Sequence, residues 1–372
     1  MGGKTNATYM KNNLLVVIGL LLINYSNCQQ VDKSNKLEIL RIQKDLIFEK
    51  TKDFPENTQL AIAIIENGNV SFDGVKRIGD TIAYMDNSKK LFEIGSITKV
   101  FTSAILAKFV LMNKVKLNDP IQEYIDYPLA NVQITLLQLA NHTSGLPKLP
   151  SNLNLATVDQ SNPYKDYDKQ KLKDYLVNNL ETANTPGENY EYSNIGAGIL
   201  GYVLELESNK SFEQLLQEYI FLEYNMKHST TNRNKVKSEM VDGLNSSGNK
   251  TANWDLNSLL AAGGIISNVQ DLSKFALAHF NDSNKALTLT REPTFEIPQY
   301  QMESGLGWKI LKPIPDLKVF AHNGGTGGYT SMITMDPASK NAVIVLSNVS
   351  AFHINTGNID QLCFQLLKTL YR

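Results

Sequence analysis

A serine and a lysine three positions apart, Ser96 and Lys99, stand at the start of a stretch with apolar residues at helical spacing. On a helix, residues three apart share a face, so the Lys99 amine can reach the Ser96 hydroxyl. Serine attacks a carbonyl only when a neighbouring base takes its proton, and lysine acts as that base only when its pKa is lowered. A Ser-x-x-Lys pair also arises by chance at ordinary helix caps, so the pair alone indicates little.

A second candidate set is Tyr192-Ser193-Asn194, which follows Pro186-Gly187 and precedes a helical pattern. A phenol beside a lysine can relay a proton, and the Asn194 amide can donate a hydrogen bond to a substrate carbonyl. The structural alternative is a turn in which Asn194 caps the following helix.

The third candidate is the glycine-rich run from His322 to Gly328, at the end of a predicted strand. Glycines allow the backbone to come close to a ligand and to present its N–H groups. A phosphate-binding loop would need Gly-Lys-Ser/Thr followed by a helix, whereas a strand pattern follows here. A plain glycine hairpin stays open as an alternative.

Taken together, the order and spacing of the three sets resemble the motifs of the serine β-lactamase and penicillin-recognising superfamily. The tyrosine that opens the middle motif is similar to that of the class C-like branch, which holds class C β-lactamases, D-Ala-D-Ala carboxypeptidases, D-aminopeptidases and esterases. Residues 92–96, 137–146 and 262–265 also resemble this branch. The resemblance extends over roughly residues 40–370.

The resemblance implies roles for the candidate residues. Ser96 is the expected nucleophile, and Lys99 and Tyr192 are expected to share the general-base work and to protonate the leaving group. Asn194 is expected to orient Lys99 and the substrate amide. The backbone N–H groups of Ser96 and Gly325 would form the oxyanion hole.

Two residues depart from the pattern of the class C β-lactamases. His322 stands where many relatives carry lysine, and Asn323 replaces the usual small hydroxyl residue. Histidine is often uncharged at neutral pH. Both departures weaken the case for efficient β-lactam hydrolysis and for recognition of a substrate carboxylate.

The expected activity is that of a serine hydrolase that cleaves an amide, ester or β-lactam bond through an acyl-enzyme on Ser96. Two alternatives stay open: a penicillin-binding or peptidoglycan-sensing module that acylates with little turnover, and a non-catalytic envelope domain. The expected partner is a small-molecule or peptide substrate, including peptidoglycan-derived peptides and β-lactams.

No cofactor and no metal are expected, because His142, His228, His279 and His353 lack metal-ligand spacing. His142 is expected to be a loop residue that bonds its own backbone.

The balance of charges and the first thirty residues indicate what the protein binds and where it is located. The 36 basic and 37 acidic side chains argue against nucleic-acid binding, which needs a strongly basic face. Lys4 and Lys11 precede an apolar run over residues 14–23, which is too short to span a membrane as a helix and fits a signal peptide cleaved before Gln29. We therefore expect export to the periplasm or the medium, with the membrane involved only through the signal or a lipid on Cys28. The alternatives are an uncleaved membrane anchor and a buried strand.

Strand patterns gather at the two ends of the chain and helical patterns lie between them. The predicted strands cover residues 59–65, 70–75, 307–311, 318–322, 329–335 and 342–346. The predicted helices cover residues 97–115, 135–140, 169–180, 195–206, 212–221, 269–280 and 359–370. Short turns between strands favour antiparallel pairing.

The predicted fold is α+β: an α/β/α sandwich with a central antiparallel sheet plus an inserted all-α lobe, of the β-lactamase/transpeptidase-like type. Residues 1–28 are assigned to the signal peptide and 29–372 to the catalytic domain. Its sheet lobe would draw on residues from about 36–96 and 304–372, and its helical lobe on about 97–303. A cleft between two such lobes is a natural ligand site. Trp254 and Trp308 are expected in the core, with cleft lining as the alternative.

Overall fold

The structure is a computed structural model that describes residues 36–129, 132–314 and 317–371. The predicted signal peptide over residues 1–28, with Cys28, lies outside the described residues. Across the described ranges, the longest apolar helices fall short of what a membrane span requires.

The chain divides into two compact units, Met1–Phe48 and Glu49–Arg372. In the first unit the structure describes residues 36–48, which are helical. The same helix ends at residue 51. The second unit contains the sheet, the other helices and all candidate catalytic residues.

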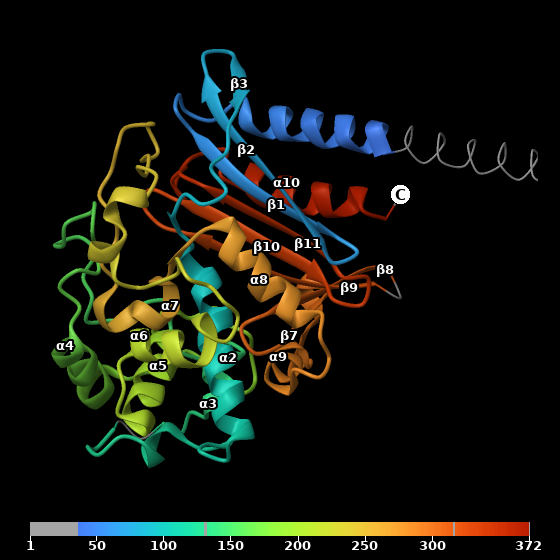
Figure 1. Cartoon of the computed structure of the whole chain (residues 1–372). Coiled ribbons are helices and arrows are strands. Elements are labelled where there is room, and N and C mark those ends of the chain that lie inside the picture. The colour runs from blue at the N-terminus through green and yellow to red at the C-terminus, as the bar shows by residue number, and fades with distance from the viewer. Residues whose placement is uncertain (1–35, 130–131, 315–316, 372) are drawn as a thin grey trace, which may run out of the picture. The chain divides into compact units, whose positions relative to one another are not determined.

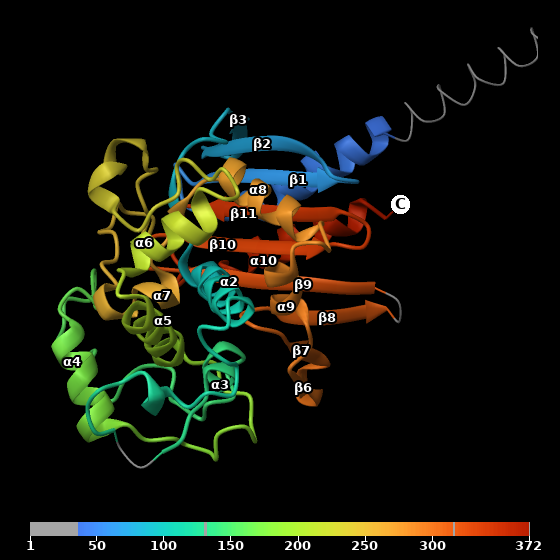
Figure 2. The ribbon, with the colours of Figure 1, turned by 60° about the horizontal axis from the view of Figure 1, so that its bottom comes forward.

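An antiparallel sheet, nine-stranded over the residues described, is the centre of the second unit (Figures 1 and 2). In spatial order its strands are β3 (Thr81–Tyr84), β2 (Asn69–Ile78), β1 (Gln59–Glu66), β11 (Asn341–Ser347), β10 (Thr330–Asp336), β9 (Leu317–Gly325), β8 (Lys309–Ile314), β7 (Met302–Ser304) and β6 (Phe295–Ile297). Early and late strands meet where β1 pairs with β11, with Leu60 opposite Ser347. A separate pair joins β4 (Phe92–Glu93) to β5 (Ile266–Ser267). The predicted antiparallel sheet built from both ends of the chain is confirmed.

Helices cover both faces of this sheet. Strands β10 and β11 are buried along their whole length, which requires cover on both sides. Helix α10 (Gly357–Thr369) packs on β10 and β11, whereas α8 (Val269–His279) packs on β1 and β11. Figure 2 shows α8 in front of the sheet and α10 behind it. The amphipathic pattern predicted at the end of the chain is thus the helix that closes the rear face.

The remaining helices build the lobe beside the sheet. They are α2 (Thr98–Leu111), α3 (Leu136–Ala140), α4 (Lys169–Asp174), α5 (Asn194–Ser208), α6 (Phe212–Leu216), α7 (Leu260–Gly263) and α9 (Lys285–Arg291). Helix α2 is buried almost throughout, and Phe101 on it stacks on Phe275 of α8 with ring centroids 4.2 Å apart. Figures 1 and 2 show α5, α6 and α7 next to α2, with α4 on the outer side of the lobe. The buried α2 therefore follows directly on the turn that contains Ser96.

The structure differs from the sequence-based prediction at the helix over residues 36–51, which was not predicted, and at several short elements. Strands β3, β6 and β7 were not predicted, because three or four residues are too few to show a two-residue alternation. The helix predicted over 97–115 begins with a 3-10 turn and ends at Leu111. The helices predicted over 169–180 and 212–221 each change to a π-helical turn halfway.

Candidate active site

Ser96 lies in a tight turn between β4 and α2. The turn is the 3-10 segment Gly95–Ile97, and Gly95 adopts the left-handed conformation with φ +50°. A Cβ on Gly95 would lie 2.5 Å from the Gly325 backbone nitrogen, so no side chain fits there. Because Gly95 has no side chain, the nucleophile turn packs directly against the end of β9.

The Lys99 amine has three oxygen neighbours. Its Nζ lies 3.0 Å from Ser96 Oγ, 2.8 Å from Asn194 Oδ1 and 2.7 Å from the Ala262 carbonyl oxygen. The Asn194 and Ala262 oxygens can only accept hydrogen bonds. A neutral amine donates its two protons to them, which leaves its lone pair directed at the Ser96 hydroxyl.

Burial favours that neutral form. Lys99 is 2% exposed, and burial, followed by the positive charges of Lys148 and Lys309, holds its pKa well below the ordinary lysine value. Charge is costly in a buried site without an ion-pair partner. The environment therefore prepares Lys99 to accept a proton from Ser96.

Tyr192 completes the contacts around the nucleophile. Its phenol is hydrogen-bonded to Ser96, and its ring centroid lies 4.9 Å from Lys99 Nζ. Burial raises the pKa of Tyr192, so the group stays a phenol rather than a phenolate. A buried phenol next to both residues can pass a proton on without itself being the resting base.

The start of α5 presents Asn194 to Lys99. Ser193, not Asn194, is the N-cap: its Oγ accepts from the Gly196 N–H at 2.9 Å and donates to the Pro147 carbonyl at 2.7 Å. The sequence-based alternative that Asn194 caps this helix is therefore wrong. As the first helical residue, Asn194 directs its side chain to Lys99.

The glycine-rich end of β9 packs on the nucleophile turn without room for side chains. A Cβ on Gly324 would lie 2.0 Å from the Ile94 carbonyl oxygen, and one on Gly325 would lie 2.5 Å from the Ala351 Cβ. Ser331 on β10 donates from Oγ to the same Ile94 oxygen at 2.8 Å. These contacts hold Gly325 next to the turn that carries the nucleophile.

His322 lies on the site face of β9, with its ring centroid 6.4 Å from that of Tyr192. Its Nδ1 is 2.7 Å from the Asn323 carbonyl oxygen, which can only accept, so Nδ1 carries the proton. Burial, with Lys309 and Lys99 nearby, holds the pKa of His322 well below its ordinary value. The ring is therefore neutral and offers a lone pair on Nε2, not a positive charge.

Asn323 points to the opposite face of the sheet. Its Oδ1 accepts from Lys309 Nζ at 3.2 Å, and its Nδ2 donates to Asp360 on α10 at 3.1 Å. Asn323 therefore contributes to the support behind the site rather than to the site itself.

His142 belongs to the site, although the sequence analysis treated it as a loop residue bonded to its own backbone. Its Nδ1 accepts from the Ser193 N–H at 3.2 Å, and its ring centroid lies 4.5 Å from that of Tyr192. Burial, followed by the charges of Lys99 and Lys309, lowers the pKa of His142 to about 3. The only sequence signal for it was its place within the resembling stretch of residues 137–146.

All six predicted residues meet in one place: Ser96, Lys99, Tyr192, Asn194, His322 and Gly325. A cleft opens over the nucleophile, and its walls include Ser96, Tyr164, Asn194, Trp254, Leu256 and Gly325. Trp254 thus lines the cleft, as the alternative had it, whereas Trp308 is a core residue. In the described part of the chain, no three His, Cys, Asp or Glu side chains are grouped to hold a metal ion.

Comparisons with known proteins identify the family to which the sequence is similar. The sequence model of the family described as Beta-lactamase matches residues 50–356. The chain is 27% identical over 342 residues to the D-alanyl-D-alanine-carboxypeptidase/endopeptidase AmpH of Escherichia coli strain K12, with 83% of this chain and 85% of that protein covered. It is 24% identical over 321 residues to the Protein flp of Staphylococcus aureus strain MW2, covering 79% of this chain but only 60% of that longer protein.

Solved structures show the same fold. A beta-lactamase/D-alanine carboxypeptidase from Pseudomonas syringae matches with a TM-score of 0.73 at 19% identity, covering 89% of this chain and 99% of that one. A beta-lactamase/D-alanine carboxypeptidase from Yersinia pestis, complexed with citrate, matches with a TM-score of 0.69 at 25% identity, covering 84% of this chain and 93% of that one.

Proposed function

The chain belongs to the beta-lactamase family, and from that premise we propose that it is a serine hydrolase that cleaves an amide, ester or β-lactam bond through an acyl-enzyme on Ser96. The observation that carries the proposal is the buried Lys99 amine, 3.0 Å from Ser96 Oγ and bound to two oxygens that can only accept. This arrangement supplies a base where the nucleophile needs one.

In the proposed reaction, the neutral Lys99 amine takes the Ser96 proton as Oγ attacks the substrate carbonyl carbon. The N–H groups of Ser96 and Gly325 stabilise the resulting oxyanion. The proton then passes from Lys99 through the Tyr192 phenol to the leaving group, the bond between the carbonyl carbon and the leaving group breaks, and the carbonyl re-forms as the Ser96 ester. In the second half of the reaction, water attacks the ester carbonyl carbon and gives a proton to Lys99 or Tyr192. The bond to Ser96 Oγ then breaks, the proton returns to Oγ, and the acid leaves.

The substrate is proposed to be a small molecule or a peptide, with esters and amides favoured over β-lactams. A neutral His322 offers no positive charge to the carboxylate that β-lactams carry. The resemblance to a D-alanyl-D-alanine-carboxypeptidase/endopeptidase supports a peptide amide as one candidate bond. Export remains part of the proposal, on the strength of the apolar run at residues 14–23.

The test is mass spectrometry of the intact mature protein after exposure to a fluorescent penicillin and, separately, to p-nitrophenyl acetate. We expect acyl addition or ester turnover in the natural protein and neither in Ser96→Ala. The same spectrum should give the mass of a chain that starts at Gln29. Equal reactivity of the two proteins would contradict the assignment of Ser96, and a long-lived penicillin adduct without turnover would favour a penicillin-binding module instead.

The lowered pKa of Lys99 predicts the pH dependence of this activity. The protonated amine cannot accept a proton, so kcat/KM for p-nitrophenyl acetate should rise as pH rises through the lowered pKa of Lys99. It should then level off well below pH 10.5, the ordinary lysine value. A stopped-flow or plate-reader pH series, corrected with Ser96→Ala, measures this. A plateau reached only above pH 10.5 would be incompatible with a neutral resting lysine.

A further inference from the structure

The cleft over Ser96 has an uncharged and largely apolar lining. Its larger side chains are those of Tyr164, Trp254, Leu256 and Leu259, and no lining residue among those described carries a charge. A substrate group that enters this cleft therefore meets aromatic and aliphatic surface. The proposed reaction uses none of these four side chains.

The cleft lies where the acyl part of a substrate would be. Tyr192, the proposed proton donor to the leaving group, is hydrogen-bonded to Ser96 but does not line the cleft. A carbonyl carbon attacked by Ser96 Oγ would therefore hold its leaving group towards Tyr192. Its acyl group would extend in another direction, into the cleft.

Three aromatic side chains form a row that leads from this cleft to the surface. The Tyr164 ring meets the Trp254 ring edge-on, with centroids 5.1 Å apart, and the Phe352 ring centroid lies 6.2 Å from that of Trp254. Tyr164 is 9% exposed, whereas Phe352 is 70% exposed. Gly327 makes room for this row, because a Cβ there would lie 2.7 Å from Trp254 Nε1.

Phe352 belongs to a loop that is bonded to the cleft. The Ala351 N–H donates to the carbonyl oxygen of Thr326, a cleft residue, at 3.1 Å. The Phe352 N–H donates to Ser350 Oγ at 3.1 Å. The phenyl ring is thus held in water beside the cleft. Exposed apolar surface that continues a cleft is typical of a ligand-binding groove.

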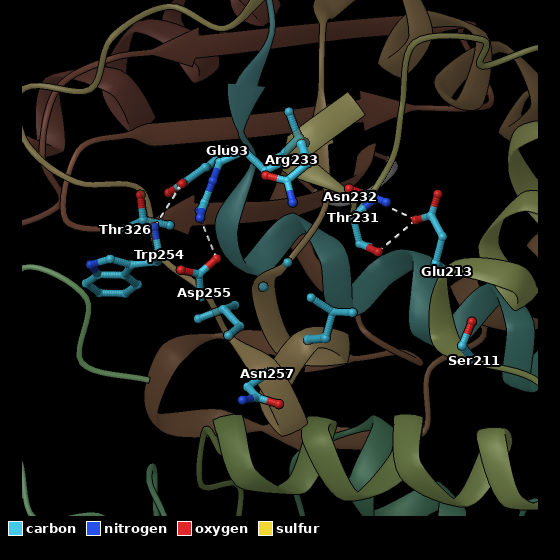
Figure 3. Close-up of a pocket in the computed structure, with 16 residues that line it drawn as sticks. Glu93, Ser211, Glu213, Thr231, Asn232, Arg233, Trp254, Asp255, Asn257 and Thr326 are labelled. Carbon is cyan, nitrogen blue, oxygen red and sulfur yellow. Dashed lines mark hydrogen bonds and ion pairs between the residues drawn. The ribbon is translucent and has the colours of Figure 1, made fainter. Parts of the chain in front are cut away.

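The polar pocket on the other side of Trp254 offers no free charge to compete with this surface (Figure 3). Arg233 Nη2 binds Asp255 Oδ1 at 2.6 Å. Glu213 accepts from neighbouring backbone and hydroxyl donors, and the buried Glu93 accepts from the Trp254 N–H. The charged groups of that pocket are therefore already bound within the protein.

We propose that Tyr164, Trp254 and Phe352 form a subsite for an apolar acyl group of the substrate, several carbon atoms long, which leaves the cleft along Trp254 and covers Phe352. The inference rests on the proposed hydrolase function, whose substrate class it narrows to esters and amides of apolar acids. Removing the exposed face of Phe352 from water favours binding in proportion to the apolar area covered.

The test compares p-nitrophenyl octanoate, kept below the concentration at which it forms micelles, with p-nitrophenyl acetate. The measured quantity is the ratio of their kcat/KM values, octanoate over acetate, because effects on the shared catalytic residues cancel in it. We expect a ratio of about ten or more in the natural protein, since full burial of only two of the additional CH₂ groups corresponds to roughly tenfold.

Three variants assign the effect to the aromatic row. Phe352→Ser should lower the ratio about threefold or more, because the end of the acyl chain then stays in water. Phe352→Leu keeps an apolar side chain and should retain most of the ratio. Leu222→Ser is the matched control: Leu222 is 75% exposed and outside the cleft, so the ratio should not change.

A ratio of one or below in the natural protein would overturn the subsite, whatever the variants do. An unchanged ratio in Phe352→Ser, or an equal fall in Leu222→Ser, would overturn it as well. Failure of the hydrolase proposal is distinguishable, because then neither ester would show turnover that Ser96→Ala removes, and the subsite would fall with it. Turnover of the acetate that depends on Ser96, together with a ratio of one, would sink the subsite alone.

Discussion

Replacing Lys99 with methionine should lower kcat/KM for p-nitrophenyl acetate by about 10³-fold or more while the fold is retained. Methionine fills a similar volume in the buried position and removes only the amine that faces Ser96 Oγ at 3.0 Å. Burial lowers the pKa of Lys99 and so favours its neutral amine, which means that the substitution should leave little unbalanced charge in the site. Steady-state kinetics and circular dichroism give the two readouts.

Two further variants separate a base from a mere packing residue. Lys108→Met on the same helix removes a partly buried amine that pairs with Glu223 away from Ser96, so activity should be unchanged. Lys99→Arg introduces a guanidinium that stays protonated and cannot act as a base, so it should be as inactive as Lys99→Met. A Lys99→Arg protein with natural activity would disprove the general-base role.

Gly95→Ala should cost both stability and activity. The alanine must adopt φ +50°, which costs roughly 1–2 kcal/mol, and its Cβ would lie 2.5 Å from the Gly325 nitrogen. Because Gly325 is proposed to supply an oxyanion N–H, the displacement should lower kcat for p-nitrophenyl acetate by about 10²-fold or more. Urea unfolding and steady-state kinetics measure the two effects.

Gly68→Ala is the matched control for this change. Gly68 also has a positive φ, +82°, but a Cβ there would meet nothing within 4 Å. It should lose a similar amount of stability from the backbone conformation and keep full activity. If Gly95→Ala lost stability to the same extent as Gly68→Ala and kept its activity, the contact with Gly325 would have no part in positioning the oxyanion N–H groups.

The sequence predicts the local part of the site and the architecture that carries it. Ser96 and Lys99 are one helical turn apart, so their contact follows from chain geometry alone. The sheet could be predicted because strands such as β1 and β11 are apolar runs, long enough to be recognised as strands in the sequence. Tyr192 and His322 were assigned through the resemblance, since nothing in their spacing from Ser96 implies contact.

The other contacts of the candidate site depend on tertiary structure, which no local sequence pattern predicts. The strand register pairs Lys309 with Ala321, the residue before His322 on β9. The positive charge of Lys309 therefore lies close enough to help lower the pKa of His322. His142 lies against Tyr192 because the Ser193 N–H binds its ring. The choice between Trp254 and Trp308 as the cleft residue was also undetermined, because a large aromatic residue fits a core and a cleft equally well.

The pairing of β1 with β11 has a consequence for how the protein is made. Strands β9 to β11 leave the ribosome long after β1 and the nucleophile turn, yet β11 is the neighbour of β1, and Ser331 and Gly324 contact the nucleophile turn at Ile94. A growing chain can therefore form Ser96 and Lys99 long before it can form a reactive centre. Reactivity would appear only after synthesis has passed β11, and until then the apolar edge of β1 depends on other factors to keep it from aggregating.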